Sequence, residues 1–597
     1  MKRFIVIPLI LIAFSLFAAP IGEQKARDIA SKFFAKSATR SSSVVLKMEW
    51  AGSDLEAATS NNSTTRSSAT DNEEKESLVY IYNRIDTRGF VVIAGDDKVK
   101  QSILAFSHDN NFNMEDMPDG AKAILQGWCE QVAATRANKN IRTVTRAEDS
   151  DTGDVVVKYE TAKWAQGKPY NTYCPKHDGK GTLTGCVATA AGIICRYFEW
   201  PEKGEGTTPS YTHTDQSVEY TVPENVLGRT YDYSKMKMSY KDGYTEEEGQ
   251  MVGALLYDIG TSIKMDYGVS GSGASTSTAA KSLVKYFGYS KGALSLRHAG
   301  RSEEEWTEML QKNLSDYGPM QFSGYSSSGG GHSFVLDGYT NKNYFSINYG
   351  WGGSSNGYYL LPNSTYYKSQ GATFYLVPDK DGSSEYKSHI MLRAFTTSGG
   401  TAYRGLCTNA TEYSAGVRPR VYIAIRNEGL VEFYGKICVA HCDKSGNIKK
   451  IIYTINKETN PLASSTTEWG YNSTVTISES IEPGDRLLAF YKEKDSEVWV
   501  RARAGESAAY EEVLMCATPQ EVAKSLKITY KKEINTLSFY AKQAIQYNIT
   551  NAKGALVASD KVKSFSTVDI DLSTFEKGKY TLSFASGGEP YTIELAL

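Results

Sequence analysis

A change of sequence periodicity near Asp379 constrains the fold of this chain more than any other feature. Before it, helix-spaced apolar runs at 186–198, 246–263, 275–287 and 303–316 accompany a late cluster of short strand-like runs. After it, only short alternating runs bounded by turn residues remain. The first pattern predicts an α+β fold and the second predicts two β-sandwich modules. Because 597 residues exceed what a single hydrophobic core supports, we expect several domains.

The N-terminal stretch MKRFIVIPLILIAFSLFAAP predicts a secretory signal peptide over residues 1–19. Two basic residues precede an apolar run that ends in small residues at Ala18 and Ala19. The run is shorter than the roughly 20 residues that a transmembrane helix needs, so a permanent membrane anchor is the weaker interpretation. No later stretch has that length, and we expect no integral membrane span after signal removal.

Charge and cysteine content exclude several kinds of protein. A formal net charge of −2 gives no field that would attract a nucleic acid, so no nucleic-acid partner is expected. Eight cysteines are spread too thinly for a disulfide scaffold. Cys438, His441 and Cys442 resemble metal ligands in their spacing, but a structural zinc ion needs a fourth donor. We therefore interpret this segment as a strand.

Cys186 stands at the start of an apolar helix, directly after Thr184 and Gly185 in the stretch LTGCVATAAGIICRYFEWP. A helix N-terminus lowers the pKa of a thiol, and its free N–H groups can bind an oxyanion. The position alone is weak evidence for a nucleophile, because a cysteine in an apolar helix is more often a packing residue. Cys195 in the same helix is interpreted as packing.

Three further residues fit a cysteine nucleophile. His332 follows a Gly-rich loop and opens an apolar strand, which suits a general base. If the strands around His332 and Asn348 pair as a hairpin, Asn348 can accept a hydrogen bond from the His332 ring, with Trp351 shielding that bond from water. Gln166 could add a side-chain oxyanion donor to the Cys186 N–H. Each residue also has an ordinary structural interpretation when it is taken alone. His332 would then be a histidine at the start of a strand, Asn348 a turn residue and Gln166 a loop residue.

Five segments carry a family resemblance: WAQGKPYN, TGCVATAAGIICRYFEWP, MDYGVSGSGAST, GGGHSFVLDGY and FSINYGWGG. They resemble streptopain, the secreted papain-like cysteine peptidases of bacteria. The stretch GFVVIAGDDKVKQSILAFSHDNNF is similar to the inhibitory propeptide of that family, so the likeness runs from about Ile21 to Pro378. It implies a zymogen with a two-lobed papain-like fold. It also implies Cys186 as nucleophile, His332 as general base, Gln166 in the oxyanion hole and Asn348 as orienter; Tyr349 stands where relatives often carry Trp.

The resemblance also implies a substrate cleft and a processing site. Gly- and Ser-rich segments can bring backbone groups against an extended peptide. The expected cleft residues are Asp266, Tyr267, Gly268, Ser270, Gly271, Ser272, Gly273, Ala274, Gly330, Gly331 and Trp351. Family members commonly prefer a hydrophobic residue one before the residue whose carbonyl is attacked. This marks the bonds after Arg142 and Thr145 for self-processing.

The expected domains are therefore a signal peptide at 1–19, an inhibitory propeptide at 20–145 and a papain-like catalytic domain at 146–379. An Ig-like β-sandwich at 380–516 and a small β domain at 517–597 follow. The last domain is similar to C-terminal sorting domains of the type IX secretion route, although its ending YTIELAL lacks the basic residues often seen there. A plain adhesive or stabilising sandwich is the alternative.

The leading hypothesis is a secreted cysteine endopeptidase that acts on protein or peptide substrates, with its own propeptide as intramolecular inhibitor. No metal or organic cofactor is expected, and calcium on the β modules is left open. A protease-derived adhesin whose β modules attach to host or matrix proteins is the alternative from another class. A cell-wall amidase using the same Cys-His chemistry is a third interpretation.

Overall fold

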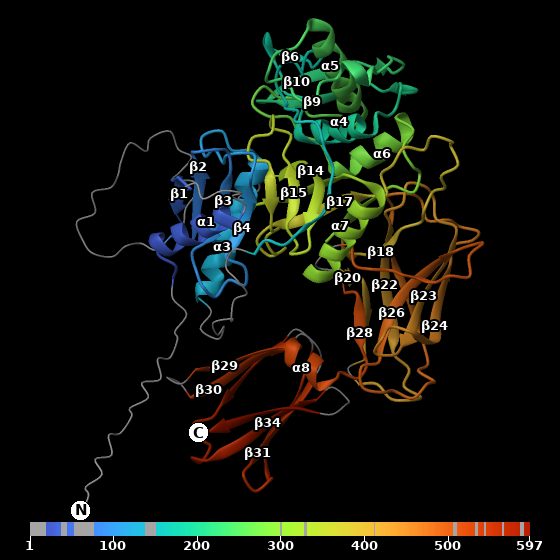
Figure 1. The fold of residues 1–597 in the computed structure, drawn as a ribbon. Coiled ribbons are helices and arrows are strands. Elements are labelled where there is room, and N and C mark those ends of the chain that lie inside the picture. Colours follow the sequence, from blue (N-terminus) through green and yellow to red (C-terminus); the bar gives the residue numbers. More distant parts are fainter. Residues whose placement is uncertain are drawn as a thin grey trace, which may run out of the picture. The chain divides into compact units, whose positions relative to one another are not determined.

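The computed structural model forms two compact units, Met1–Glu385 and Tyr386–Leu597, which are described separately (Figure 1). The described residues are 20–36, 44–52, 77–137, 151–298, 301–326, 331–410, 412–505, 510–531, 535–541, 545–563, 566–585 and 590–596. The expected signal peptide, the bonds after Arg142 and Thr145, and Gly330 lie outside these residues. Within these ranges no helix is long and apolar enough to cross a membrane.

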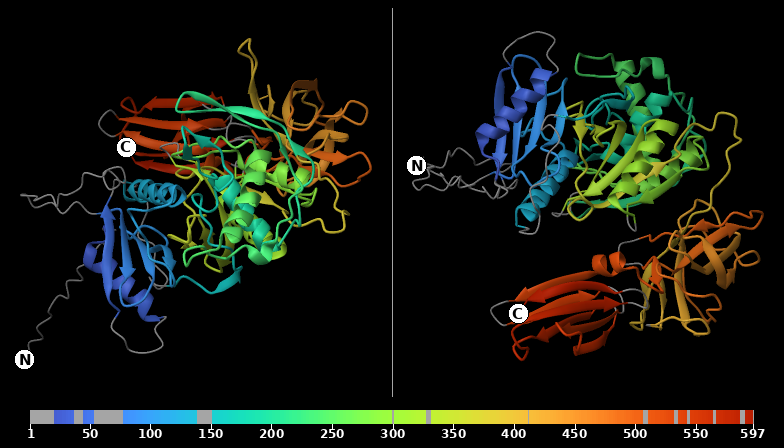
Figure 2. Two further views of the ribbon diagram at one scale, coloured as in Figure 1. Left: turned by 90° about the horizontal axis from the view of Figure 1, so that it is seen from above. Right: turned by 60° about the horizontal axis from the view of Figure 1, so that its bottom comes forward.

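The N-terminal part of the first unit is a four-stranded antiparallel meander with a helix on each face. Its elements are α1 (Glu23–Lys36), β1 (Leu46–Gly52), β2 (Val79–Arg84), β3 (Phe90–Ala94), β4 (Ile103–Ser107) and α3 (Asp119–Ala137). Alternation along β2 sends Tyr80 and Tyr82 to the core beneath α1, and Val79 and Ile81 to the core beneath α3. Figure 2 shows the two helices on separate sides of these strands.

A helical lobe contains the apolar helix α4 (Cys186–Phe198), packed against α5 (Glu246–Ser262) and α6 (Thr276–Tyr286). Every residue of α4 from Val187 to Cys195 is buried, so the helix is fixed on all sides. Short elements surround it: β6 (Lys176–His177), β7 (Lys180–Gly181), β8 (Thr207–Thr208), β9 (Tyr211–Asp215), β10 (Val218–Val222), β11 (Asn225–Val226) and the 3-10 turn η1 (Tyr233–Lys235).

A second lobe is built on antiparallel strands backed by α7 (Glu303–Tyr317). Its strands are β5 (Val155–Lys158), β12 (Leu294–Arg297), β13 (Met320–Tyr325), β14 (Gly331–Thr340), β15 (Phe345–Asn348), β16 (Gly357–Tyr359) and β17 (Lys368–Phe374). The strand order is β16-β15-β14-β13-β17-β12, and β5 also pairs with β14. A helical lobe beside a sheet lobe confirms the predicted two-lobed α+β arrangement.

The N-terminal meander and the sheet lobe share one sheet, a feature the sequence pattern did not predict. Strand β4 pairs with β16 through Phe106 opposite Tyr358 and Ala105 opposite Tyr359. Trp128 of α3 stacks on the Tyr359 ring at a centroid distance of 5.9 Å, and its Nε1 donates to the carbonyl of Leu360 at 3.1 Å. The N-terminal part therefore adheres to the sheet lobe by both strand pairing and core packing.

The second unit contains the two predicted β modules. The first has one sheet of β18 (Ile390–Leu392), β21 (Leu406–Thr408), β22 (Arg420–Asn427) and β25 (Thr467–Thr474), and another of β23 (Gly435–Cys442), β24 (Ile448–Asn456), β26 (Arg486–Glu493), β27 (Val500–Arg501) and β28 (Glu512–Leu514). Both sheets contribute to one core. A separate pair is β19 (Ala394–Thr396) with β20 (Ala402–Arg404). Cys438, His441 and Cys442 lie on β23, which confirms the strand interpretation.

The last module begins with α8 (Pro519–Ser525) and has two facing sheets around one core. One sheet contains β29 (Leu526–Lys531), β30 (Thr536–Ala541) and β33 (Ser566–Asp571). The other contains β31 (Ile545–Asn551), β32 (Leu556–Val562), β34 (Lys579–Ala585) and β35 (Tyr591–Ala596). The predicted fold class, an α+β catalytic part between an α/β segment and two β modules, is confirmed.

Candidate active site

Cys186 occupies the first position of α4, where the helical lobe meets the sheet lobe. The preceding Gly185 has φ of 82°, a conformation that favours glycine. A Cβ at this position would also lie 2.6 Å from the Met265 side chain and 3.0 Å from the carbonyl of Ser272. Backbone geometry and space therefore both require glycine immediately before Cys186.

His332 lies near the start of β14, on the opposite lobe, and is buried. Its Nε2 atom is 3.1 Å from the carbonyl oxygen of Tyr349. Because a carbonyl can only accept, Nε2 carries a proton, and Nδ1 is the nitrogen left for Cys186. The carbonyl of Tyr349 thus sets both the tautomer and the orientation of the imidazole.

Cys186 and His332 shift each other's pKa in the directions that favour an ion pair. Burial opposes ionisation of Cys186, but the charge and hydrogen bond of His332 and the N–H groups of Ser333 and Val187 outweigh it, so the pKa of the thiol lies below its ordinary value. Burial also opposes the charged imidazole, but Cys186 and the Tyr349 carbonyl outweigh it and raise the pKa of His332. The pair is electrostatically suited to exist as thiolate and imidazolium.

The predicted hydrogen bond between Asn348 and His332 is wrong. The register of β14 and β15 places Asn348 opposite Val335, so His332 extends beyond the end of β15. Asn348 Nδ2 donates instead to Thr161 Oγ1 and to the carbonyl of Ala162, both at 2.9 Å. Its Oδ1 accepts from the Gly350 N–H at 3.2 Å. Trp351 consequently has no such bond to shield.

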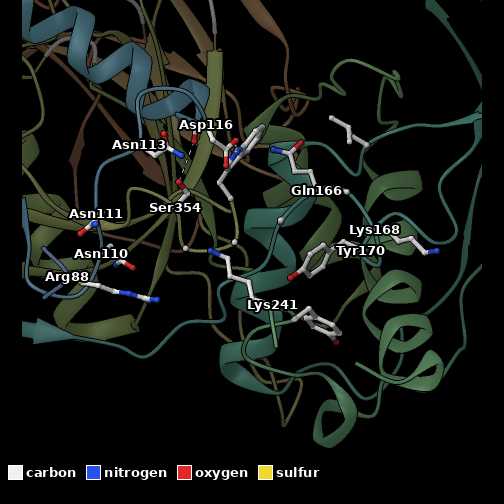
Figure 3. A pocket seen from close by; sticks show the side chains of 17 residues that line it. Arg88, Asn110, Asn111, Asn113, Asp116, Gln166, Lys168, Tyr170, Lys241 and Ser354 are labelled. Carbon is white, nitrogen blue, oxygen red and sulfur yellow. Dashed lines mark hydrogen bonds between the residues drawn. The ribbon is translucent and has the colours of Figure 1, made fainter. Parts of the chain in front are cut away.

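Gln166 lies beside the nucleophile through its backbone. Its carbonyl accepts from the Thr184 N–H at 3.1 Å, two residues before Cys186. Its side chain lines a cavity of about 630 Å³, and Figure 3 shows the amide at the end of the cavity where Asp116 lies. The cavity is lined by Arg88, Asn110, Asn111, Asn113, Asp116, Ala165, Gln166, Gly167, Lys168, Tyr170, Leu183, Tyr240, Lys241, Trp351, Gly352, Gly353 and Ser354.

The predicted cleft segment 266–274 is a closed loop tied to the residues before Cys186. Backbone hydrogen bonds join Asp266 and Gly273 in both directions, and the Leu183 N–H donates to the carbonyl of Gly268. Ser272 Oγ donates to the carbonyl of Leu183 at 2.7 Å. Ser270, Gly271 and Gly273 are exposed, whereas Ser272 and Ala274 are half-buried.

Two residues of this predicted segment are not available to a ligand. Tyr267 is 1 % exposed and belongs to the core of the helical lobe, and Gly268 is buried. The prediction that they line the cleft is therefore wrong. Tyr267 packs in the core of the helical lobe, and the Gly268 N–H and carbonyl are bonded to Ser272 Oγ and to the Leu183 N–H. Asp266 has an exposed side chain whose Oδ1 is 3.6 Å from His213 Nδ1. Gly331 is exposed at the start of β14, and Trp351 is half-buried beside the cavity.

Sequence reasoning missed Gln321 of β13. This fully buried amide donates to the carbonyl of Val187 at 3.1 Å and to Ser333 Oγ at 2.9 Å. It therefore links the neighbour of Cys186 to the neighbour of His332 across the two lobes. A polar residue at an inward position of an otherwise apolar strand was the only available signal.

Sequence reasoning also missed the N-terminal residues that cover the site. A Cβ at Gly120, in the first turn of α3, would lie 2.6 Å from His332 Cδ2 and 3.0 Å from Tyr349 Cδ1. Trp351 Nε1 donates to Asp116 Oδ1 at 3.1 Å. The start of α3 therefore lies directly on the imidazole. No group of three or more His, Cys, Asp or Glu side chains within the described ranges is arranged to hold a metal ion.

Comparison with known families gives three matches along the chain. Residues 164–359 match the Peptidase C10 family, residues 18–132 match the Spi protease inhibitor, and residues 524–596 match the Secretion system C-terminal sorting domain. Of the two alternatives for the last module, the sorting domain is thus the one supported. The chain is that of a secreted or cell-surface protein.

Similar proteins include the Thiol protease/hemagglutinin PrtT of Porphyromonas gingivalis, 32% identical over 380 residues. That alignment covers 60% of this chain and 41% of the relative, so the chain spans less than half of PrtT. Streptopain of Streptococcus pyogenes is 30% identical over 303 residues, which cover 48% of this chain and 74% of the relative. A prointerpain A fragment from Prevotella intermedia has a TM-score of 0.42 and 28% identity, covering 51% of this chain and 97% of that structure.

Proposed function

Because the chain belongs to the Peptidase C10 family, we propose that it is a secreted cysteine endopeptidase made as a zymogen, with Cys186 as nucleophile and His332 as general base. The observation that carries the proposal is the meeting of these two residues from opposite lobes. Cys186 begins a rigid buried helix, and His332 begins a central strand whose end is fixed by hydrogen bonds. Both side chains are therefore held in place before a substrate arrives.

The proposed reaction begins with the Cys186 thiolate attacking the carbonyl carbon of a peptide bond. The tetrahedral intermediate collapses when the imidazolium of His332 protonates the leaving amine through Nδ1, which leaves a thioester on Cys186. His332, now neutral, accepts a proton from water as the water attacks the thioester. Cleavage of the C–S bond releases the carboxylic acid and restores the thiolate and imidazolium pair.

The oxyanion of each tetrahedral intermediate is assigned to two donors. The Cys186 N–H belongs to the first turn of α4, where backbone N–H groups have no partner inside the helix. The Gln166 side chain supplies the second donor, and the bond between the Gln166 carbonyl and the Thr184 N–H supports its position next to Cys186. Preformed donors of this kind stabilise developing negative charge.

We assign the orientation of His332 to the backbone carbonyl of Tyr349 instead of the Asn348 side chain. The distance of 3.1 Å from Nε2 to that oxygen supports the assignment. Asn348 acts on His332 indirectly, because its hydrogen bonds to Thr161, Ala162 and Gly350 fix the backbone on both sides of Tyr349. Asn348 is thus a positioning residue in this account.

The zymogen state is assigned to the N-terminal part of the chain, residues 20–145. The contact of Gly120 with His332 and the pairing of β4 with β16 support intramolecular inhibition. Maturation would remove this part by cleavage after Arg142 or Thr145. N-terminal sequencing of the mature protein is expected to begin between residues 140 and 156; a start far outside that interval would refute the assignment.

The substrate cleft is assigned to the exposed part of the loop 266–274, to Gly331 and to Trp351. The loop presents backbone groups of the exposed residues Ser270 and Gly271 next to the residues that precede the nucleophile. Such a surface suits an extended peptide recognised through its main chain. Protein or peptide substrates are therefore the proposed class.

Hydrolysis of casein by matched variants tests the proposed function. Wild type is expected to release peptides, to be inhibited by an epoxide thiol reagent, and to lose activity completely as Cys186→Ala. Cys195→Ala is the matched control: its thiol is fully buried in the same helix, and burial raises its pKa to about 12. Full activity of Cys186→Ala would refute the proposal.

A further inference from the structure

The turn Trp351–Ser354 binds Asp116, a residue of the N-terminal part, by two hydrogen bonds. Trp351 Nε1 donates to Asp116 Oδ1 at 3.1 Å, and Ser354 Oγ donates to the backbone carbonyl of Asp116 at 3.4 Å. Figure 3 shows Asp116 and Ser354 facing each other at one end of the cavity. A carboxylate side chain and its own main chain are therefore both recognised by the catalytic part.

The turn does not depend on Asp116 for its shape. The Gly352 N–H donates to the carbonyl of Trp164 at 2.7 Å, and the Ser354 N–H donates to the carbonyl of Trp351 at 3.1 Å. Gly352 and Gly353 have φ of 64° and 84°, so the turn uses a backbone form that glycine adopts readily. Trp351 Nε1 and Ser354 Oγ consequently remain as preformed donors when the N-terminal part leaves.

Two lysines of the catalytic part lie against the same turn. Lys241 Cε is 3.3 Å from the position of a Cβ on Gly352, and Lys163 Cδ is 3.1 Å from the position of a Cβ on Gly353. Across the described ranges neither lysine has an acidic ion-pair partner. Neither lysine forms an ion pair with Asp116, so the two lysines add only longer-range positive charge to the surroundings of Trp351 Nε1 and Ser354 Oγ. Such a charge favours a carboxylate at these donors.

The position of the turn beside the His332 acceptor points to the leaving-group side of the scissile bond. Trp351 follows Tyr349, whose carbonyl binds His332, and His332 is the group that protonates the leaving amine. The loop 266–274 instead contacts Leu183 and Gly185, which precede the nucleophile. A substrate residue at the turn therefore follows the bond that is cut.

We propose that the mature enzyme has a carboxylate-binding subsite at Trp351 and Ser354, with Lys163 and Lys241 against the same turn, which selects Asp or Glu C-terminal to the cleaved bond. In the zymogen Asp116 occupies this subsite. The proposal rests on the proposed peptidase function and adds a preference on the leaving-group side of the substrate.

Internally quenched peptides test the preference on mature enzyme. All peptides share one sequence before the scissile bond and carry Asp, Asn, Ala or Lys at the first, second or third position after it. At one of these positions we expect kcat/KM for Asp to exceed that for isosteric Asn by about fivefold, the size of one favourable exposed charge interaction. Raising the salt concentration to about 0.5 M should reduce the ratio, because exposed charges are screened.

Single substitutions test which residues cause the preference for Asp. Lys241→Gln and Lys163→Gln should lower the Asp-to-Asn ratio while leaving hydrolysis of the Ala peptide measurable, and Trp351→Phe should lower it by removing the N–H. Lys168→Gln is the matched control. Lys168 is an exposed lysine whose ammonium group points away from Asp116 in Figure 3, so this variant should keep the ratio.

The outcomes distinguish the two proposals. Cleavage of all peptides at equal rates, or a ratio that survives Lys241→Gln together with Lys163→Gln, would overturn the subsite and leave the peptidase function intact. Absence of cleavage of every peptide by mature enzyme that also fails on casein would overturn the peptidase function itself.

Discussion

At the scale of single residues, the site depends on how one imidazole is held. The Tyr349 carbonyl accepts from Nε2 of His332, which leaves Nδ1 for Cys186. A backbone acceptor cannot rotate away as a side chain can, and its position depends on the chain around Asn348. The proposed catalytic geometry therefore depends on the end of a strand, and side-chain substitutions would act on it indirectly.

The pH dependence of mature enzyme follows from the pKa shifts of Cys186 and His332. The pKa of Cys186 is lowered and that of His332 is raised, so the ion pair persists between the two ionisations. We expect kcat/KM to rise with pH as Cys186 loses its proton and to fall at higher pH as His332 loses its own. Because Cys186 and His332 titrate together, the midpoints of the rise and the fall are properties of the pair and not of either residue alone.

A pH series of initial rates on a neutral peptide measures this profile. A single rise with a midpoint near the ordinary thiol value of about 8.5, without a falling limb, would contradict the ion pair. Circular dichroism across the same range is the control that separates ionisation from unfolding.

Replacement of Asn348 tests whether the carbonyl or the amide orients His332. Asn348→Ala removes three buried hydrogen bonds, and we expect a loss of about 1–3 kcal/mol in the free energy of unfolding. At a temperature where the variant is folded, kcat/KM should fall only severalfold, because the Tyr349 carbonyl still binds His332 but its backbone is held less firmly, and the pH profile should keep both limbs. Asn348→Asp, which keeps the acceptor to Gly350 and loses the two donors, should also be destabilised.

A large loss of activity without a loss of stability would support the role expected from the sequence, in which Asn348 orients His332. General-base catalysis contributes about a hundredfold or more, so a loss of that size in kcat/KM with an unchanged melting temperature would show that Asn348 orients the ring. Thermal melts and steady-state rates on the same preparations decide between the two.

At the scale of elements, the first turn of α3 lies against His332, and we assign inhibition to this contact. Gly120 brings the helix within contact distance of His332 and Tyr349, and an alanine there would overlap the imidazole. Overpacking of this kind costs about 1–3 kcal/mol. We expect Gly120→Ala zymogen to hydrolyse a small fluorogenic peptide roughly tenfold or more faster than wild-type zymogen, before any cleavage is visible on a gel.

Gly22→Ala is the matched control for this experiment. Gly22 belongs to the same N-terminal part, and a Cβ there has nothing within 4 Å. Equal rates for wild type and Gly120→Ala would show that the contact with His332 contributes nothing to inhibition.

Prediction from sequence was accurate for elements and inaccurate for their alignment. The helix predicted over 186–198 is α4 (Cys186–Phe198), because a continuous apolar run after Thr-Gly identifies both its start and its burial. The hairpin of β14 and β15 was also expected. The register of this hairpin could not be predicted, because the alternation of side chains does not specify how far one strand is shifted along the other. The register decides whether Asn348 or the Tyr349 carbonyl reaches His332.

At the scale of the whole molecule, the contacts that could not be predicted from the sequence are those between segments far apart in the chain. Pairing of β4 with β16 joins residues about 250 positions apart, and no local pattern specifies such contacts. The positions of Gly120 and Asp116 over the catalytic residues depend on that pairing. Motifs were enough to propose the nucleophile and base, whereas the proposed inhibitory contacts and carboxylate subsite required the three-dimensional arrangement.

Covalent labelling of mature enzyme with an epoxide thiol reagent, followed by peptide mass spectrometry, tests whether Cys186 is the nucleophile. We predict that the label appears on the peptide containing Cys186, that activity falls in proportion to labelling, and that His332→Ala lowers the rate of labelling. Loss of activity with Cys186 unlabelled, or full activity with Cys186 labelled, would show that Cys186 is not the nucleophile.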